Sequence, residues 1–114
     1  MGAMMEPVWL DGGLATRAQV ELSEIADLAG QGFRSLICNR PDGEDPGQPG
    51  FAAISAEAAR HGMQAVHVPV VPGQIGPADV RAMAEALAQL PRPILAYCRS
   101  GARSQGLWRA AKAA

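Results

Sequence analysis

Short apolar runs alternate along the chain with longer segments whose apolar residues recur every three or four positions. The short runs predict strands, and the longer segments predict amphipathic helices. The predicted strands cover residues 8–10, 35–38, 66–71 and 94–97. The run at 94–97 is apolar throughout, as is typical of a strand that is buried on both faces of a sheet.

Helix boundaries are indicated by capping residues, glycines and prolines. Thr16 is predicted to cap a first helix that ends near Gly30, and a second helix is predicted over about 51–60. Pro77 suits the first position of a third helix, which Pro91 stops. A last helix is predicted from about residue 103 to the end of the chain.

Strands that are separated by helices predict βαβ crossovers. The expected fold class is therefore three-layer α/β, with a mainly parallel sheet of four to five strands flanked by helices. Ligands of such folds bind beyond the carboxyl ends of the strands. Cys98 directly follows the last predicted strand, and the long loop 39–50, with three prolines, three glycines and three acidic residues, follows the second.

The composition describes an ordinary globular chain of 114 residues, 48% hydrophobic and 18% charged, with a net charge of −1. One domain is expected over 5–114, because residues 1–4 look like a cloning scar. The charge does not indicate a nucleic acid or membrane partner, and no apolar run approaches a membrane span of about 20 residues. Two cysteines and no secretory signal predict a cytoplasmic protein without a metal or organic cofactor.

Cys98 begins the segment Cys-Arg-Ser-Gly-Ala-Arg, at a predicted strand-to-helix turn. Inward amides and the helix dipole stabilise an anion there, and such positions lower a cysteine pKa from about 8.5 to about 3.5–7.5. Gly101 lets the backbone approach a ligand, and Arg99 and Arg103 can grip an oxyanion. A lone cysteine is more often a small buried apolar residue. Two arginines beside the thiol favour a catalytic nucleophile instead.

The loop from Cys98 to Ser104 resembles the active-site loop of single-domain rhodanese sulfurtransferases. Four residues separate Cys98 from Arg103, whereas cysteine-dependent phosphatases have five. The resemblance implies that a Cys98 persulfide carries sulfane sulfur from thiosulfate or glutathione persulfide to a thiol acceptor. It implies two catalytic residues, Cys98 and Arg103, and a substrate-binding set of Arg99, Ser100, Gly101, Ala102 and Ser104.

Motifs along the rest of the chain, such as Asn-Arg-Pro-Asp-Gly-Glu at 39–44 and His-Val-Pro-Val at 67–70, resemble a second group of proteins. This group is the phosphatase-like domain of beta-lactamase hydrolase-like proteins, also called DUF442. The resemblance implies a scaffold like that of dual-specificity phosphatases. It also implies a partner, because members occur fused to sulfur dioxygenases or sulfide oxidoreductases, and it therefore favours sulfide and persulfide metabolism.

A cysteine phosphatase also needs an acid that protonates the leaving oxygen. Residues 70–77 contain no carboxylate, and Gln74 stands where the family would place an equivalent. The remaining candidates, none of them placed by the sequence, are Asp42, Glu44, Asp45 and Asp79. Because persulfide exchange needs little protonation, sulfur transfer is the leading hypothesis. A dual-specificity-type phosphatase is the alternative, and a non-catalytic binding or redox-sensing module is the third.

Three further residues keep two interpretations each. His67 is expected to be packed or hydrogen-bonded within its strand rather than catalytic. Cys38 is expected to be buried and inert, with a resolving thiol for Cys98 as the alternative. Arg40 follows a strand at the same edge as Cys98, so it can either bind an anion or pair with the acidic residues of the loop.

Overall fold

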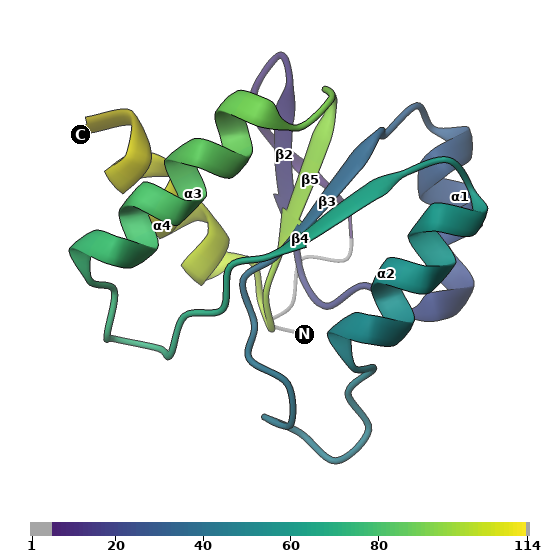
Figure 1. The fold of residues 1–114 in the computed structure, drawn as a ribbon, viewed down its shortest axis with the longest axis horizontal. Coiled ribbons are helices and arrows are strands. Elements are labelled where there is room, and N and C mark those ends of the chain that lie inside the picture. Colours follow the sequence, from purple (N-terminus) through teal and green to yellow (C-terminus); the bar gives the residue numbers. More distant parts are fainter. Residues whose placement is uncertain (1–5, 114) are drawn as a thin grey trace.

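The computed structural model describes residues 6–113, so the predicted cloning scar at 1–4 lies outside the described residues. The described chain forms five short strands, four α-helices and one 3₁₀ helix (Figure 1). The strands are β1 Val8–Asp11, β2 Leu14–Arg17, β3 Ser35–Cys38, β4 Gln64–His67 and β5 Ile94–Tyr97. The helices are the 3₁₀ turn η1 Leu22–Glu24 and α1 Ile25–Gly30, α2 Phe51–Arg60, α3 Pro77–Gln89 and α4 Ala102–Ala113.

The strands make one mixed sheet in the order β1-β2-β5-β3-β4. Only the β1–β2 pair is antiparallel, whereas β2, β5, β3 and β4 run parallel to one another. Parallel neighbours need crossover connections, which the helices supply. The predicted mainly parallel sheet is confirmed.

Helices cover both faces of the sheet, with α1 and α2 on one side and α3 and α4 on the other (Figure 1). The side chains of β5 show the two faces by alternation. Leu95 and Tyr97 pack with the α1 and α2 residues, while Ile94 and Ala96 pack with those of α3 and α4. All four are fully buried. A central strand therefore has no polar face, which is why residues 94–97 are continuously apolar.

The predicted first helix, capped by Thr16, is wrong. Thr16 lies in β2, which pairs with β1 across a turn at Gly12 and Gly13 and with β5 on its other side. Leu14 and Ala15 are completely buried in this position. Two glycines between apolar runs are a hairpin signal, and here the hairpin outweighs the capping preference of threonine.

Helical structure begins later, at η1, and its entry is capped by acidic residues. The Glu21 amide donates to Glu24 Oε1 at 2.8 Å. The strand predicted at 66–71 is β4, which begins two residues earlier and ends four residues earlier. Beyond it, the Val68 and Val70 amides still donate to the carbonyls of Cys38 and Asn39 at 2.9 and 3.1 Å, without regular pairing. The other predicted strands and helices lie within one or two residues of their observed bounds.

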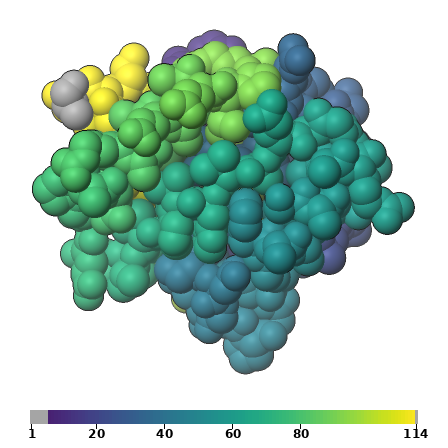
Figure 2. Space-filling view, viewed as in Figure 1, coloured from purple at the N-terminus to yellow at the C-terminus, as the bar shows by residue number. Residues whose placement is uncertain are grey.

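Three connections leave the sheet at the same edge, beyond the carboxyl ends of β3, β4 and β5 (Figure 1). They are residues 39–50, 68–76 and 98–101. The first two project from the body of the molecule with an indentation between them (Figure 2). Within the described residues, no helix combines the length and the apolar character that crossing a membrane requires.

Candidate active site

Cys98 lies at the bottom of the loop between β5 and α4 and is 1% exposed. The Gly101 amide donates to Cys98 Sγ at 3.1 Å. Gly101 has a φ of 102°, a left-handed conformation that side chains disfavour and that turns its amide toward the sulfur. The loop therefore curls around the thiol, as an anion cradle requires.

The surroundings of Cys98 favour its thiolate. Burial alone raises the pKa of Cys98, but hydrogen bonds from the amides of Ser104, Gly101 and Ser100 outweigh it, so the pKa lies below the ordinary value. The Ser104 hydroxyl lowers the pKa further. That hydroxyl is completely buried and has no hydrogen-bond partner among the described residues, so it is available to the sulfur.

Cys38 has the opposite surroundings. Burial raises the pKa of this thiol, and its strongest opposing contact is with Tyr97. Cys38 Sγ donates to the carbonyl oxygen of Arg40 at 3.3 Å, and both cysteines are free thiols. Cys38 is thus a poor nucleophile, as expected of a thiol in an apolar strand.

Arg103 closes the cradle from the first turn of α4. Its Nη1 and Nη2 donate to Glu44 Oε2 and Oε1 at 2.8 and 2.9 Å, in a bidentate ion pair. Nη1 also donates to the carbonyl oxygen of Val70 at 2.9 Å. Only 12% of the Arg103 side chain is exposed. The guanidinium is therefore tied to both of the neighbouring connections, 39–50 and 68–76.

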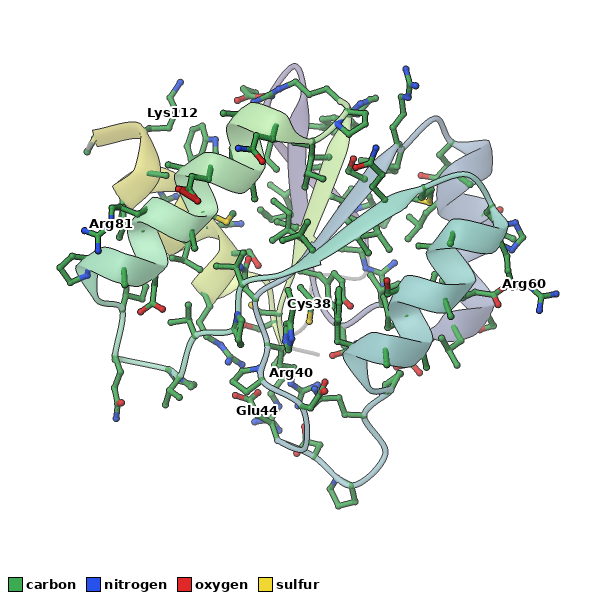
Figure 3. The ribbon with its side chains drawn as sticks, in the orientation of Figure 1. Cys38, Arg40, Glu44, Arg60, Arg81 and Lys112 are labelled. Atoms are coloured by element: carbon green, nitrogen blue, oxygen red, sulfur yellow. The ribbon has the colours of Figure 1, made fainter. Side chains whose placement is uncertain are left out.

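Arg40 is buried, with 3% exposure, and each of its three guanidinium nitrogens has a partner within the protein. Its Nε donates to Glu44 Oε1 at 2.8 Å, its Nη1 donates to Gln19 Oε1 at 2.9 Å, and its Nη2 pairs with Asp45. Arg40 and Glu44 lie next to each other beneath the sheet edge, while Arg60 and Arg81 point away at the periphery (Figure 3). Of the two interpretations of Arg40, the structure shows the pairing with acidic residues.

The other residues predicted to bind substrate surround the thiol at different depths. Arg99 is 70% exposed at its side chain, and its Nε lies 3.5 Å from Asp45 Oδ2. The Ala102 amide donates to Ser100 Oγ at 3.4 Å, which closes the turn into α4. These positions line the mouth of the cradle, and the roles of these residues in substrate binding stay predictions.

Two predicted candidates are not brought to the thiol. Gln74 is exposed on the 68–76 connection, and its side chain makes no hydrogen bond among the described residues. Asp79 Oδ2 accepts a hydrogen bond of 2.8 Å from the Gly76 amide and so caps α3.

His67 stacks on Phe51 with ring centroids 4.6 Å apart, and its Nε2 lies 2.8 Å from the carbonyl oxygen of Arg40. That is the packed, hydrogen-bonded role expected for it.

Glu44 is the residue whose role the sequence did not reveal. It was a candidate acid or a partner of Arg40, but it also binds Arg103. The Arg103 hydrogen bonds are the largest cause that lowers the pKa of Glu44, to about 2. Glu44 is therefore ionised at neutral pH and cannot donate a proton in this arrangement. Its only sequence signal is its place in a long loop at the same sheet edge as Cys98.

Comparison with known proteins identifies the family. The family model for the phosphatase-like domain of beta-lactamase hydrolase-like protein matches residues 9–114. The chain belongs to this family. A beta-lactamase hydrolase-like protein of Agrobacterium fabrum is 36% identical over 104 residues, and one of Xylella fastidiosa 9a5c is 40% identical over 95. These matches cover 91% and 83% of the chain but only 24% and 22% of the relatives, so the chain spans about a quarter of their length.

Solved structures show the same scaffold. A protein of Neisseria meningitidis Z2491, provisionally named a phosphatase, superposes with a TM-score of 0.82 at 35% identity, over 89% of this chain and 72% of that one. A DUF442 protein of Shewanella putrefaciens CN-32 gives 0.81 at 16% identity, over 96% and 68%. Kinase-associated phosphatase, solved with its catalytic cysteine replaced by serine, gives 0.66 at 16% identity, over 89% and 67%. The predicted phosphatase-like α/β fold is confirmed.

The prediction of a rhodanese-type sulfurtransferase is wrong. The family and the structural neighbours are phosphatase-like, so the expected rhodanese chemistry and role in sulfide metabolism are wrong as well. The prediction depended on one missing residue between Cys98 and Arg103. That gap is a weak discriminator, because the shorter loop still presents the amide of Gly101 to the sulfur and ends at an arginine.

Proposed function

We propose that the domain is a cysteine-dependent phosphatase acting on phosphate monoesters. The observation that carries the proposal is the buried Cys98 sulfur, which accepts a hydrogen bond from the Gly101 amide in a loop that ends at the Arg103 guanidinium. A thiolate supplies the nucleophile, and amides with a guanidinium neutralise the charge on the phosphoryl oxygens. The relatives support the proposal, since the phosphatase fold positions a catalytic cysteine in kinase-associated phosphatase.

The reaction takes two steps. Cys98 Sγ attacks the phosphorus atom, the bond from phosphorus to the ester oxygen breaks, and that oxygen leaves with the bonding electron pair. The enzyme then holds an S-phosphocysteine, with Arg103 and the loop amides around its oxygens. Water attacks the same phosphorus atom, the P–S bond breaks, and inorganic phosphate and the thiolate are released.

The carboxylates of Glu44 and Asp45 near the cradle are engaged in ion pairs with arginines. Glu44 is paired with Arg103 and Arg40, and Asp45 is paired with Arg40 and lies near Arg99. The 68–76 connection contains no carboxylate. The proposed substrates are therefore esters of acidic alcohols, above all phenols, whose oxygen leaves without protonation.

The decisive test is turnover of an aryl phosphate such as p-nitrophenyl phosphate. Cys98→Ser is expected to abolish turnover, and Cys38→Ser is expected to retain it, because Cys38 is buried in β3 and bonded away from the loop. Equal turnover by the Cys98→Ser variant would refute the proposal. The predicted partner, a fused or cognate sulfur dioxygenase or sulfide oxidoreductase, stays a prediction, as does a cytoplasmic location.

A further inference from the structure

The Arg103 guanidinium has five N–H donors, and three of them are taken by the protein. Nη1 uses both of its donors, on Glu44 Oε2 and on the carbonyl oxygen of Val70, and Nη2 uses one, on Glu44 Oε1. The Nε–H and the second Nη2–H have no acceptor among residues 6–113. These two bonds point in parallel along one edge of the guanidinium, the arrangement that binds two oxygens of a tetrahedral oxyanion.

The Cys98 thiolate also affects the pKa of the Arg103 guanidinium. Its pKa is raised chiefly by Glu44 and additionally by the negative charge of Cys98. Arg103 ends the six-residue loop that begins at Cys98, and its Nη1–Nη2 side is turned to Glu44. The Glu44 carboxylate occupies the Nη1–Nη2 edge of Arg103 and leaves the Nε–Nη2 edge for an oxyanion.

Glu44 is itself fixed in place. Its Oε1 accepts from Arg40 Nε and from Arg103 Nη2, at 2.8 and 2.9 Å, so one oxygen bridges two guanidinium groups. Arg40 cannot follow a ligand, because it is 3% exposed and its Nη1 and Nη2 are held by Gln19 and Asp45. The buried arginine therefore sets the position of the carboxylate, and the carboxylate sets that of Arg103.

We propose that Glu44 is a positioning residue, which orients the free edge of Arg103 toward an oxyanion above Cys98, with Arg40 as its buried support. The inference rests on the proposed function. The opposing interpretation makes Glu44 an internal anion that competes with substrate for Arg103. The two interpretations differ in sign: removing a positioning carboxylate weakens oxyanion binding, whereas removing a competitor, or simply a negative charge, strengthens it.

The test measures protection of Cys98 from iodoacetamide by inorganic phosphate, read by mass spectrometry of the peptide that contains Cys98. It requires no turnover. In Glu44→Gln, the amide presents a donor to one Arg103 nitrogen in place of an acceptor, so the phosphate concentration for half-protection is expected to rise about tenfold or more, the loss expected of a charge-assisted contact. Glu44→Asp keeps the charge on a shorter side chain and is expected to restore part of the affinity.

The matched control is Glu57→Gln, the same chemical change on α2, where Glu57 pairs with Arg60 and His61. Its phosphate protection is expected to equal that of the wild type. Unchanged or tighter phosphate binding in Glu44→Gln overturns the inference and leaves the phosphatase proposal standing. Wild-type protein that phosphate does not protect contradicts both. If Glu44→Gln does not fold, as judged by its thermal transition, Glu44→Asp decides alone: half-protection at the wild-type phosphate concentration overturns the inference.

Discussion

Glu44 and Arg103 are 59 residues apart in the sequence, and their side chains form a two-bond ion pair with oxygen–nitrogen distances of 2.8 and 2.9 Å. The pair joins the long loop after β3 to the first turn of α4. Because Arg103 belongs to the loop around Cys98, this contact fixes the cradle to a second part of the chain. The geometry of the site therefore depends on tertiary contacts as well as on the sequence of residues 98–103.

The shape of the Arg103 guanidinium, not only its charge, is expected to matter. In Arg103→Lys, the ammonium is a point charge without the planar donor edges of a guanidinium, so it cannot make bidentate hydrogen bonds to both Glu44 and a phosphate. We expect kcat/KM for an aryl phosphate to fall by about 10²–10³, the effect typical of losing one oriented donor in an anion-stabilising site. Steady-state kinetics measure it. Arg99→Lys, at a largely exposed position, is the control and is expected to stay within a few-fold of the wild type.

The Ser104 hydroxyl is expected to stabilise the Cys98 thiolate. Ser104→Ala removes the hydroxyl and leaves the amide in place, so the pKa of Cys98 is expected to rise. The measurement is the pH dependence of the iodoacetamide reaction at Cys98, whose midpoint should move to higher pH. Ser100→Ala provides a comparison, because the Ser100 hydroxyl is bonded to the Ala102 amide. An equal midpoint in wild type and Ser104→Ala would show that the amides alone stabilise the thiolate.

Leaving-group acidity is expected to govern the rate. Because Glu44 and Asp45 are held in ion pairs with arginines, we expect negative charge to accumulate on the departing oxygen, so a plot of log kcat/KM against the pKa of substituted phenols should slope steeply downward. Alkyl phosphates are expected to be poor substrates. A flat plot would reveal an acid catalyst, and repeating the series in Asp45→Asn and Asp42→Asn would show whether either aspartate supplies it.

The sequence predicted most of the scaffold because its signals are local. The uninterrupted apolar run at β5 and the proline that begins α3 each depend on a few neighbouring residues. The hairpin strand β2 was missed because Thr16 carries two local preferences, for capping and for strands. Only the pairing with β1 and β5 decides between them.

The site was predicted in part for the same reason. Cys98, Gly101 and Arg103 lie within six residues, so their chemistry is legible in the sequence. The contact between Glu44 and Arg103 cannot be predicted from the sequence, since any of three carboxylates on the loop could have reached Arg103. The choice depends on how the loop packs around the buried Arg40. The wrong prediction of sulfur transfer has a similar origin, because it depended on the spacing within one loop and not on the scaffold that surrounds the loop.

The ion pairs of Glu44 are expected to make stability depend on acid pH. Its pKa is about 2 in the folded protein against an ordinary value of 4.5, so the folded state favours the ionised carboxylate. The resulting stabilisation is complete above about pH 4.5 and is lost as the pH falls toward 2, because the unfolded chain takes up the proton first. Urea unfolding at pH 6 and at pH 3 measures the effect. Wild-type protein should lose more stability between the two pH values than Glu44→Gln, whereas Glu57→Gln should follow the wild type. Parallel losses in wild type and Glu44→Gln would show that the pair does not stabilise the fold.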